Sequence, residues 1–424
     1  MIAEAVVPRR NVRTGMLLLA ATAMTAGSFT LFQHWLQPSP EQARKTNNHG
    51  LTKEKLAEFL GNSAAFYRFP TEIELPAGVN KIKAVVQYSF DQGLQSEMEG
   101  LFDAYQPDYG AFVAVDATTG RVLSMISYQK DEKGPLKDEN LALRATFPSA
   151  SVFKVVTAAA AIESQRYSAQ TVIPFNGANH TLYRGNVLKG QVTRWTRHST
   201  LKEAFAKSIN TVFAKIGAFA VGPTDLRAYA GRFGFNRKIA ADFPIQQGKA
   251  NIPDDSWGVA EAASGYTREN TMSPLQGALI ASSVANDGVM MEPYLIDSIF
   301  DRDGASLYQA DTEVAGRTID AKTAEEIRGL MRETVARGTS RHSFRGFFRK
   351  EYKDLDVGGK TGSLTGLDPK GKYDWFVGYA NSPEKGGRKI AFAALTIHDK
   401  FWRVKSSYLV RKAIEHVFKT PKQK

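Results

Sequence analysis

The sequence predicts a protein of the α/β class, of the α+β type, in which an antiparallel sheet is flanked by helices and carries an inserted all-helical lobe. A hairpin pattern lies at 111–127, and three further strand patterns joined by short turns lie at 357–398. A long block of helical patterns separates them. Strands joined by short turns pair antiparallel. The helical block is therefore expected to form a second lobe, with a cleft between the two.

The composition is that of a globular chain with a sizeable core. The 424 residues include 43% hydrophobic and 23% charged residues, and no cysteine, which excludes disulfides and thiolate metal sites. The formal net charge is +12. A basic chain can bind nucleic acid or an anionic surface. The basic residues are dispersed and form no nucleic-acid motif, so we expect no nucleic-acid partner and interpret the charge as a sign of an anionic envelope.

The N-terminus has the pattern of a membrane anchor. Arg9, Arg10 and Arg13 precede an uncharged apolar run at 14–33, which is close to the ~20 residues that span a bilayer. Arginines on the near side predict that residues 1–13 form a cytoplasmic tail. A cleaved signal peptide is the alternative. In both cases the rest of the chain is expected to be exported.

Residues 34–83 are expected to form a linker or short N-terminal region with little structure of its own. This stretch mixes Pro, Asn, Lys and Glu without a clear period, apart from a short helical pattern near 51–60. The main domain is therefore expected to span residues 84–420.

The main domain is expected to open with a helix and a hairpin. Residues 91–105 carry apolar side chains at helical spacing. Residues 111–116 and 121–127 have strand character, and 117–120 form the turn between them.

The helical block and the closing strands follow. Helices are expected from Ser151 onward and at 200–217, 224–233, 272–286 and 321–336, the last with Asp320 as its N-cap. Strands are expected at 357–363, 374–380 and 388–398, followed by a helix at 406–418.

Lys154 is the most unusual local feature. It lies within 152–162, where every other residue except Thr157 is apolar, and a helix that is apolar all round is buried on all sides. Burying an unpaired ammonium is unfavourable, so such a lysine tends to lose its proton and to become a base. The alternative is that Lys154 lies near the helix start and extends outward to solvent.

Ser151 precedes Lys154 by three residues, so both side chains are expected on one face of one helical turn. A serine at a helix start, beside a neutral amine and free backbone amides, is a candidate nucleophile. The alternative is that Ser151 or Ser149 only caps the helix. The spacing alone does not identify a site, because it recurs at Ser127–Lys130, Ser199–Lys202 and Ser382–Lys385. Among these pairs, only Ser151 and Lys154 open a buried helix.

Two further short motifs follow along the chain. Ser208-Ile209-Asn210 lies in the helical block and is commonplace by itself. Lys360-Thr361-Gly362 follows two glycines on an expected strand. Glycine inside a strand often marks the close approach of another backbone, and an open strand edge can accept an extended peptide. The alternative is that these glycines mark a turn.

In their order along the chain, the three motifs resemble those of the transpeptidase domain of penicillin-binding proteins: Ser-x-x-Lys, Ser-x-Asn and Lys-Thr-Gly. The resemblance covers about residues 83–418 and implies the β-lactamase/transpeptidase-like fold. Further segments that look like that domain, in matching order, are Asp91 with Leu94-Gln95, Val115–Leu123, Met272–Gln276, Asn286–Gly288 and Asp374–Gly378.

The resemblance implies catalytic roles for four residues. Ser151 would be the acylated nucleophile, and Lys154 would take its proton. Ser208 would relay a proton to the leaving amine. Lys360 would add a second positive charge that helps to keep Lys154 neutral.

The resemblance also implies substrate-binding positions. Asn210 would hold the substrate amide, and Thr361, Gly362 and Ser363 belong to the substrate-binding strand. The hydroxyls of Thr361 and Ser363 would bind the substrate carboxylate. The backbone amides of Ser151 and Ser363 would form the oxyanion hole.

The implied protein is a serine-type peptidoglycan D,D-transpeptidase, attached to the cell inner membrane by a single span, with its catalytic domain periplasmic. Its substrate would be a stem peptide ending in D-Ala-D-Ala, and β-lactams would acylate Ser151. No cofactor or metal is expected, because no His-Glu-x-x-His motif is present. The span between the anchor and residue 84 is short for a glycosyltransferase domain, so a separate polymerase is the expected partner.

The sequence departs from the family pattern in two places, and alternatives remain open. Pro148-Ser149-Ala150 stands where many members have Pro-Gly-Ser, and Ser363 stands where threonine is common. A D,D-carboxypeptidase or a β-lactamase on the same scaffold is one alternative; no Glu-x-x-Leu-Asn segment follows Asn210, which argues against a class A β-lactamase. A non-enzymatic β-lactam-binding module is another alternative.

Overall fold

The structure is a computed structural model that describes residues 51–61, 64–77, 80–130, 139–189 and 191–419. The cytoplasmic tail and the apolar run expected at 1–13 and 14–33 lie outside these residues. In the described part of the chain, none of the helices combines the length and the apolar character that a bilayer span requires.

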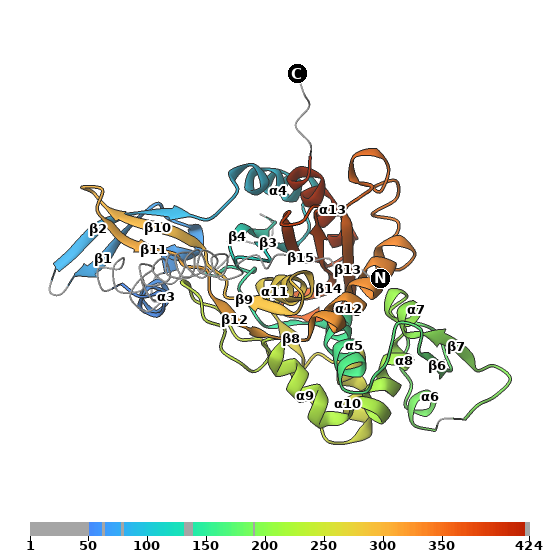
Figure 1. The fold of residues 1–424 in the computed structure, drawn as a ribbon. Helices are drawn as coiled ribbons and strands as arrows, with labels where there is room; N and C mark the ends of the chain where they lie inside the picture. Colours follow the sequence, from blue (N-terminus) through green and yellow to red (C-terminus); the bar gives the residue numbers. More distant parts are fainter. Residues whose placement is uncertain (1–50, 62–63, 78–79, 131–138, 190, 420–424) are drawn as a thin grey trace, which may run out of the picture.

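A five-stranded antiparallel sheet forms the centre of the molecule and confirms the predicted fold class (Figure 1). Its strand order is β13-β14-β15-β3-β4, so the early hairpin pairs with strands from the end of the chain. β13 is an edge strand whose sheet neighbour is β14. The strands are β3 (Tyr109–Asp116), β4 (Val122–Gln129), β13 (Asp356–Leu367), β14 (Lys370–Asn381) and β15 (Lys389–His398).

Helices cover both faces of this sheet (Figure 1). One face carries α4 (Gln92–Tyr105) and α13 (Ser406–Val417), and the other carries α11 (Pro274–Ala285). α11 is buried along its whole length because it lies against the sheet on one side and other helices on the other. This is why its sequence is apolar and alanine-rich all round.

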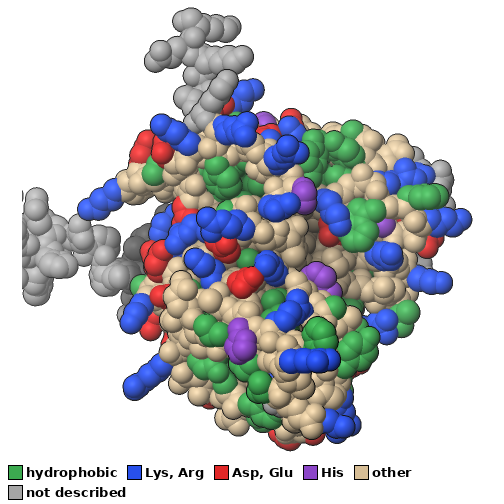
Figure 2. Space-filling view, turned by 90° about the vertical axis from the view of Figure 1, so that its right-hand side faces the viewer, with side chains coloured by type: hydrophobic (Ala, Val, Ile, Leu, Met, Phe, Trp, Pro, Cys, Tyr) green, Lys and Arg blue, Asp and Glu red, His purple; other side chains and the backbone are tan. Residues whose placement is uncertain are grey.

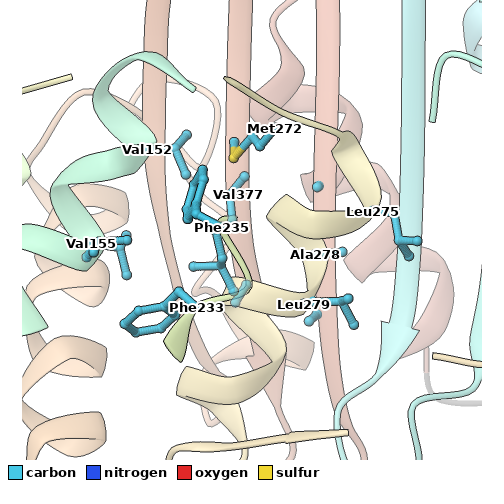
Figure 3. Close-up of a cluster of buried hydrophobic side chains, with 14 of the residues drawn as sticks. Val152, Val155, Phe233, Phe235, Met272, Leu275, Ala278, Leu279 and Val377 are labelled. Atoms are coloured by element: carbon cyan, nitrogen blue, oxygen red, sulfur yellow. The ribbon is translucent and has the colours of Figure 1, made fainter. Parts of the chain in front are cut away.

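The main core lies between the sheet, α11 and the helical lobe. Figure 3 shows part of it, where Leu275 and Leu279 of α11 lie on one side and Val152 and Val155 on the other, with Val377 of β14 between them. All five side chains are fully buried. Burial of such a side chain stabilises the fold by roughly 1.5–3 kcal/mol. The chain between and directly after the candidate Ser–Lys pair is therefore anchored in the core.

The inserted block is mainly helical, but the prediction of an all-helical lobe is wrong in one part, because residues 172–175 and 197–200 pair there as two antiparallel strands. Its helical elements are η3 (Ala150–Phe153), α5 (Lys154–Glu163), α6 (Arg184–Leu188), α7 (Leu201–Ala206), α8 (Asn210–Lys215), the π-helix η4 (Ile216–Val221), α9 (Gly222–Arg232), α10 (Ser256–Ser264) and α12 (Ala321–Ala336). The Asp320 side chain accepts a hydrogen bond from the amide of Thr323 at 2.6 Å, which confirms the predicted N-cap of α12.

Two helix predictions need correction. The helix expected from Ser151 begins with the 3₁₀ turn η3, and its α-helical part starts at Lys154. The single helix expected at 200–217 is wrong: it is divided into α7 and α8, because Ser208 adopts a left-handed backbone with φ +54°. One residue in this conformation breaks the helical hydrogen-bond ladder.

The expectation of little structure before residue 84 is wrong for the described residues. α3 (Lys53–Gly61) confirms the short helical pattern near 51–60. The unexpected elements are the 3₁₀ turn η1 (Ala64–Arg68), β1 (Glu72–Ala77) and β2 (Asn80–Tyr88). β1 and β2 join β10 (Ile296–Asp301) and β11 (Ser306–Gln309) in a second sheet, at the left of Figure 1. The boundary expected at residue 84 falls inside β2. The partner strands lie more than two hundred residues further on, which is why a local pattern could not reveal them.

Short elements complete the fold. They are β5 (Phe147–Pro148), β6 (Val172–Phe175), β7 (Arg197–Thr200), β8 (Thr271–Met272), β9 (Val289–Met291), β12 (Val314–Arg317) and the 3₁₀ turn η5 (Lys350–Tyr352).

Candidate active site

Ser151 lies in the 3₁₀ turn that precedes α5. The preceding residue, Ala150, has a left-handed backbone with φ +47°, which a residue with a Cβ rarely adopts. Gly265, which ends α10, packs on this turn: a Cβ there would overlap the carbonyl oxygen of Ala150. The Ser149 side chain makes no cap hydrogen bond, and Ser151 Oγ contacts Lys154 instead. The capping alternative is therefore wrong.

Lys154 is buried, so the alternative in which it extends to solvent is wrong. Its side chain is 0% exposed. Its Nζ lies 2.7 Å from Ser151 Oγ, 2.7 Å from Asn210 Oδ1 and 3.4 Å from Ser208 Oγ. Burial, and then the nearby charge of Lys360, hold the pKa of Lys154 well below its ordinary value. No carboxylate of the described residues pairs with this amine, so both effects favour its neutral, basic form.

The break between α7 and α8 aims two polar side chains at Lys154. Ser208 lies at the break, and its Oγ also accepts a hydrogen bond from Lys360 Nζ at 3.0 Å. Asn210 opens α8, and its Nδ2 donates to the carbonyl oxygen of His180 at 2.8 Å. This bond orients the amide so that Oδ1 faces the amine. Ser208 therefore connects the two lysines, and Asn210 holds Lys154 from the other side.

Lys360 is the second buried amine of the site. It lies on β13, is 0% exposed, and also donates to the carbonyl oxygen of Thr361 at 2.8 Å. Burial lowers its pKa to about 7. At neutral pH it therefore exchanges readily between its charged and neutral forms.

The glycines of β13 mark close approach, as one of the two sequence interpretations predicted, and not a turn. A Cβ at Gly359 would overlap the ring of Phe376 on β14. A Cβ at Gly362 would lie 3.2 Å from Val152 Cγ2 and 3.4 Å from Ala150 Cβ. The absence of a side chain at Gly362 lets the edge strand lie against the turn that carries Ser151, and at Gly359 it leaves room for the Phe376 ring.

These residues meet at a cleft of about 370 Å³. Five of the sequence-predicted site residues line it: Ser151, Ser208, Asn210, Thr361 and Ser363. The two buried lysines bond to these lining residues from behind the cleft wall, and Gly362 packs beside it.

Sequence reasoning missed several residues of the cleft wall. They are His180, Gly265, Tyr266, Thr339, His342, Ser343, Asp374, Lys405 and Ser407. Asp374 belongs to a segment that the resemblance singled out, but no local sequence pattern predicts that its side chain lines the cleft. Burial raises its pKa to about 6, against the opposing charge of Lys405. The pKa of His180 is lowered by burial and then by the two buried lysines.

Within the part of the chain that the structure describes, no group of His, Cys, Asp and Glu side chains is arranged to hold a metal ion. The cleft places the Ser151 hydroxyl beside an amine whose neutral form is favoured. An amine that accepts the Ser151 proton generates a nucleophile in a site already lined by hydrogen-bond donors.

The model of the family described as "Penicillin binding protein transpeptidase domain" matches residues 110–416 of this chain. The chain belongs to this family. The family was the one indicated by the ordered motifs, and the match includes all three of them.

Two curated relatives carry the name "Peptidoglycan D,D-transpeptidase PbpA". The protein from Mycolicibacterium smegmatis is 28% identical over 347 residues, which cover 74% of this chain and 66% of the relative. The protein from Mycobacterium tuberculosis is 28% identical over 331 residues, which cover 69% of this chain and 62% of the relative. The chain thus spans slightly less than two thirds of these relatives.

Solved structures confirm the β-lactamase/transpeptidase-like fold. PBPA from Mycobacterium tuberculosis superimposes with a TM-score of 0.62 at 24% identity, covering 80% of this chain and 81% of that chain. The transpeptidase domain of penicillin-binding protein 3 from Burkholderia pseudomallei superimposes with a TM-score of 0.59 at 20% identity, covering 82% and 100% of the two chains.

Proposed function

We propose that this protein is a peptidoglycan D,D-transpeptidase that cross-links stem peptides through an acyl-enzyme on Ser151, and that β-lactams acylate the same residue. The observation that carries this proposal is the buried Lys154, which is hydrogen-bonded to Ser151 Oγ and pairs with no carboxylate in the described part of the chain. Two relatives named peptidoglycan D,D-transpeptidase support the reaction class.

Acylation begins with proton transfer from Ser151 to Lys154. The amine donates its two N–H groups to Asn210 Oδ1 and Ser208 Oγ, which leaves its lone pair for the Ser151 hydroxyl. Ser151 Oγ then bonds to the carbonyl carbon of the penultimate D-Ala. The backbone amides of Ser151 and Ser363 stabilise the oxyanion. The C–N bond to the terminal D-Ala breaks, and the leaving amine takes its proton through Ser208, which the proton on Lys154 replenishes.

The second half of the reaction transfers the acyl group to an amine. The amine of another stem peptide attacks the ester carbonyl, loses a proton to Lys154, and releases Ser151 Oγ, which regains its proton. Lys360 keeps Lys154 neutral between these steps by like-charge repulsion. The donor peptide adds to the free edge of β13, with its terminal carboxylate on the hydroxyls of Thr361 and Ser363 and its amide on Asn210.

Penicillin labelling tests this proposal. The exported part of the chain is incubated with a fluorescent penicillin, and the labelled peptide is identified by mass spectrometry. Ser151→Ala should abolish the label, whereas Ser382→Ala, in a second Ser-x-x-Lys pair, should retain it. A label that survives in Ser151→Ala refutes the assignment.

The lifetime of the adduct separates the alternative functions. A transpeptidase should hold it for on the order of hours, and a β-lactamase for well under one second. Release of free D-Ala without a cross-linked product would indicate a D,D-carboxypeptidase. A lasting adduct without release of D-Ala and without a cross-linked product would indicate a non-enzymatic β-lactam-binding module.

We propose further that residues 14–33 anchor the protein in the inner membrane, with 1–13 cytoplasmic and residues 84–420 as the periplasmic transpeptidase domain. The uncharged apolar run after Arg13 supports the anchor. We also propose a separate glycosyltransferase as partner, because the span between the anchor and residue 84 is short for a glycosyltransferase domain. Membrane fractionation of the full chain and of a chain beginning at residue 34 tests the anchor: the shortened chain should leave the membrane fraction.

A further inference from the structure

A second cavity lies next to the catalytic cleft, under the loop that follows α12. Its volume is about 570 Å³, and its lining includes Arg341, His342, Arg345, Phe348 and Arg349. His342 also lines the cleft, so the two hollows share a wall. The proposed reaction uses no residue of this cavity.

The three arginines of the cavity have no counter-charge among the described residues. Neighbouring arginines do: Arg337 pairs with Glu333 at 3.2 Å, and Arg411 pairs with Glu415 at 2.7 Å. No hydrogen bond or ion pair joins Arg341, Arg345 or Arg349 to another described side chain. Three exposed arginines that line one cavity without an ion pair in the described part of the chain give it a positive potential, which favours the binding of an anion.

The loop is held in place by its apolar side chains. Phe344 and Phe347 are buried, with ring centroids 5.5 Å apart, and Phe344 also packs on Phe376 of β14 at 5.8 Å. Arg411 of α13 donates to the carbonyl oxygen of Ser343 at 2.9 Å. Apolar anchors thus fix the backbone that carries the three arginines, which lowers the cost of ordering this loop when a ligand binds.

The cavity lies on the side of the cleft toward which the acceptor stem peptide of the proposed reaction would extend. The leaving amine of the donor and the attacking amine of the acceptor occupy the same place relative to the acyl carbon. An acceptor therefore continues past Thr361, whose hydroxyl lies 2.5 Å from that of Thr339. Beyond Thr339, the cleft wall is formed by His342 and Ser343. That wall leads into the arginine-lined cavity.

We propose that Arg341, Arg345 and Arg349 bind the carboxylates of the acceptor stem peptide, and so select an acidic peptide as the amine that attacks the acyl-enzyme. This inference rests on the proposed transpeptidase function. Arginine suits the task because its fork binds carboxylates with two parallel hydrogen bonds. Figure 2 shows that Lys and Arg side chains are also widespread over the face on which α7 and β7 lie, which favours an anionic substrate.

The test measures how the acyl-enzyme partitions between aminolysis and hydrolysis. The full chain reacts with a small thioester donor in the presence of an acidic stem peptide or of the same peptide with amidated carboxylates. The triple variant Arg341→Gln/Arg345→Gln/Arg349→Gln should lower the aminolysis-to-hydrolysis ratio about tenfold for the acidic peptide and less than twofold for the amidated one. The triple Arg→Lys variant, which keeps the charge, should recover part of this loss. Penicillin labelling of Ser151 verifies that each variant is folded.

Salt and a distant arginine provide the controls. In the wild type, the ratio for the acidic peptide should fall as salt rises, because screening weakens exposed charge contacts, and this dependence should vanish in the Gln variant. Arg302→Gln, at the exposed turn between β10 and β11, removes a positive charge far from the cleft and should leave the ratio unchanged.

The outcomes are distinguishable. An unchanged ratio in a triple Gln variant that still forms the penicillin adduct overturns the acceptor site. If that variant instead loses binding to vesicles of anionic phospholipid, the arginines face a membrane and the inference is also overturned. Failure of the wild type to acylate overturns the proposed function itself.

Discussion

Replacing Lys360 by methionine tests the electrostatic link between the two buried lysines. Both nitrogens contact Ser208 Oγ, at 3.4 Å for Lys154 and 3.0 Å for Lys360, so about 6.4 Å is the largest separation between them. Two unit charges at that distance interact by about 2.6 kcal/mol at an effective dielectric constant of about 20. That energy corresponds to about an 80-fold change in the proton affinity of Lys154.

The direction follows from the sign of the charges. A charged Lys360 opposes protonation of Lys154 and lowers its pKa. The pKa of Lys360 is about 7, so this repulsion is fully present below that pH and is lost above it. Without Lys360, Lys154 keeps its proton to higher pH. Because 6.4 Å is the largest possible separation, the acidic limb of the pH–rate profile should move upward by about 2 pH units or more.

The assay is the pH dependence of the second-order rate constant for penicillin acylation. The position of the limb is the readout, because loss of Lys360 also changes substrate binding and therefore the absolute rate. Lys405→Met is a matched control: Lys405 lines the cleft and lies 3.8 Å from Asp374, and no hydrogen bond links it to Lys154. The acidic limb of the pH–rate profile of Lys405→Met should stay where it is in the wild type. A limb that stays fixed or moves to lower pH in Lys360→Met refutes the proposed coupling.

Three further variants test the site and the fold. Lys154→Met should slow acylation by about 10²–10⁴-fold, as expected for loss of a general base, while denaturant titration shows the unfolding free energy within about 2 kcal/mol of the wild type. Gly265→Ala should lower that free energy by about 1–3 kcal/mol, because the left-handed backbone at φ +67° and the Ala150 carbonyl both oppose a Cβ; Gly231→Ala, where a Cβ meets no atom within 4 Å, is its control. Burial raises the pKa of Asp242 to about 7, so the native state binds this proton more tightly than the unfolded state, and the unfolding free energy should fall as pH rises from about 4 to about 7. Asp242→Asn should remove most of that slope in denaturant titrations at several pH values.

Each of these variants can contradict the reasoning. Normal acylation in Lys154→Met would mean that another group takes the Ser151 proton. Equal stability in the Gly265 and Gly231 variants would mean that the turn before Ser151 tolerates a shift. If the unfolding free energy of Asp242→Asn depends on pH with the same slope as that of the wild type, groups other than Asp242 cause this dependence.

Much of the candidate site was readable from local patterns. Lys154 stood out because a charge inside an apolar helical run has few physical explanations, and the structure confirms its burial. The β13 glycines were readable for a similar reason, since their lack of side chains lets strand and turn approach. Ser208 was only partly readable. Its motif was noted, but the left-handed backbone that separates α7 from α8 depends on contacts from other elements.

The arginine-lined cavity and the second sheet had no local signal. Arg341, Arg345 and Arg349 look like ordinary surface residues until Phe344 and Phe347 are seen to be buried beneath them. β1 and β2 find their sheet partner in β10, far along the chain. Pairings of this kind depend on which strands meet in space, which no short window of sequence contains.

By itself, the sequence determined the class of fold, the order of its main elements and the identity of the Ser–Lys pair, because periodicity and a misplaced charge act over one or two helical turns. Only the tertiary structure decided that Lys154 is enclosed by Ser151, Ser208 and Asn210, and that Lys360 reaches the same hydroxyl. The physical reason is that a lysine becomes a base through desolvation and nearby charge. Both come from residues that are distant in sequence and adjacent only after folding.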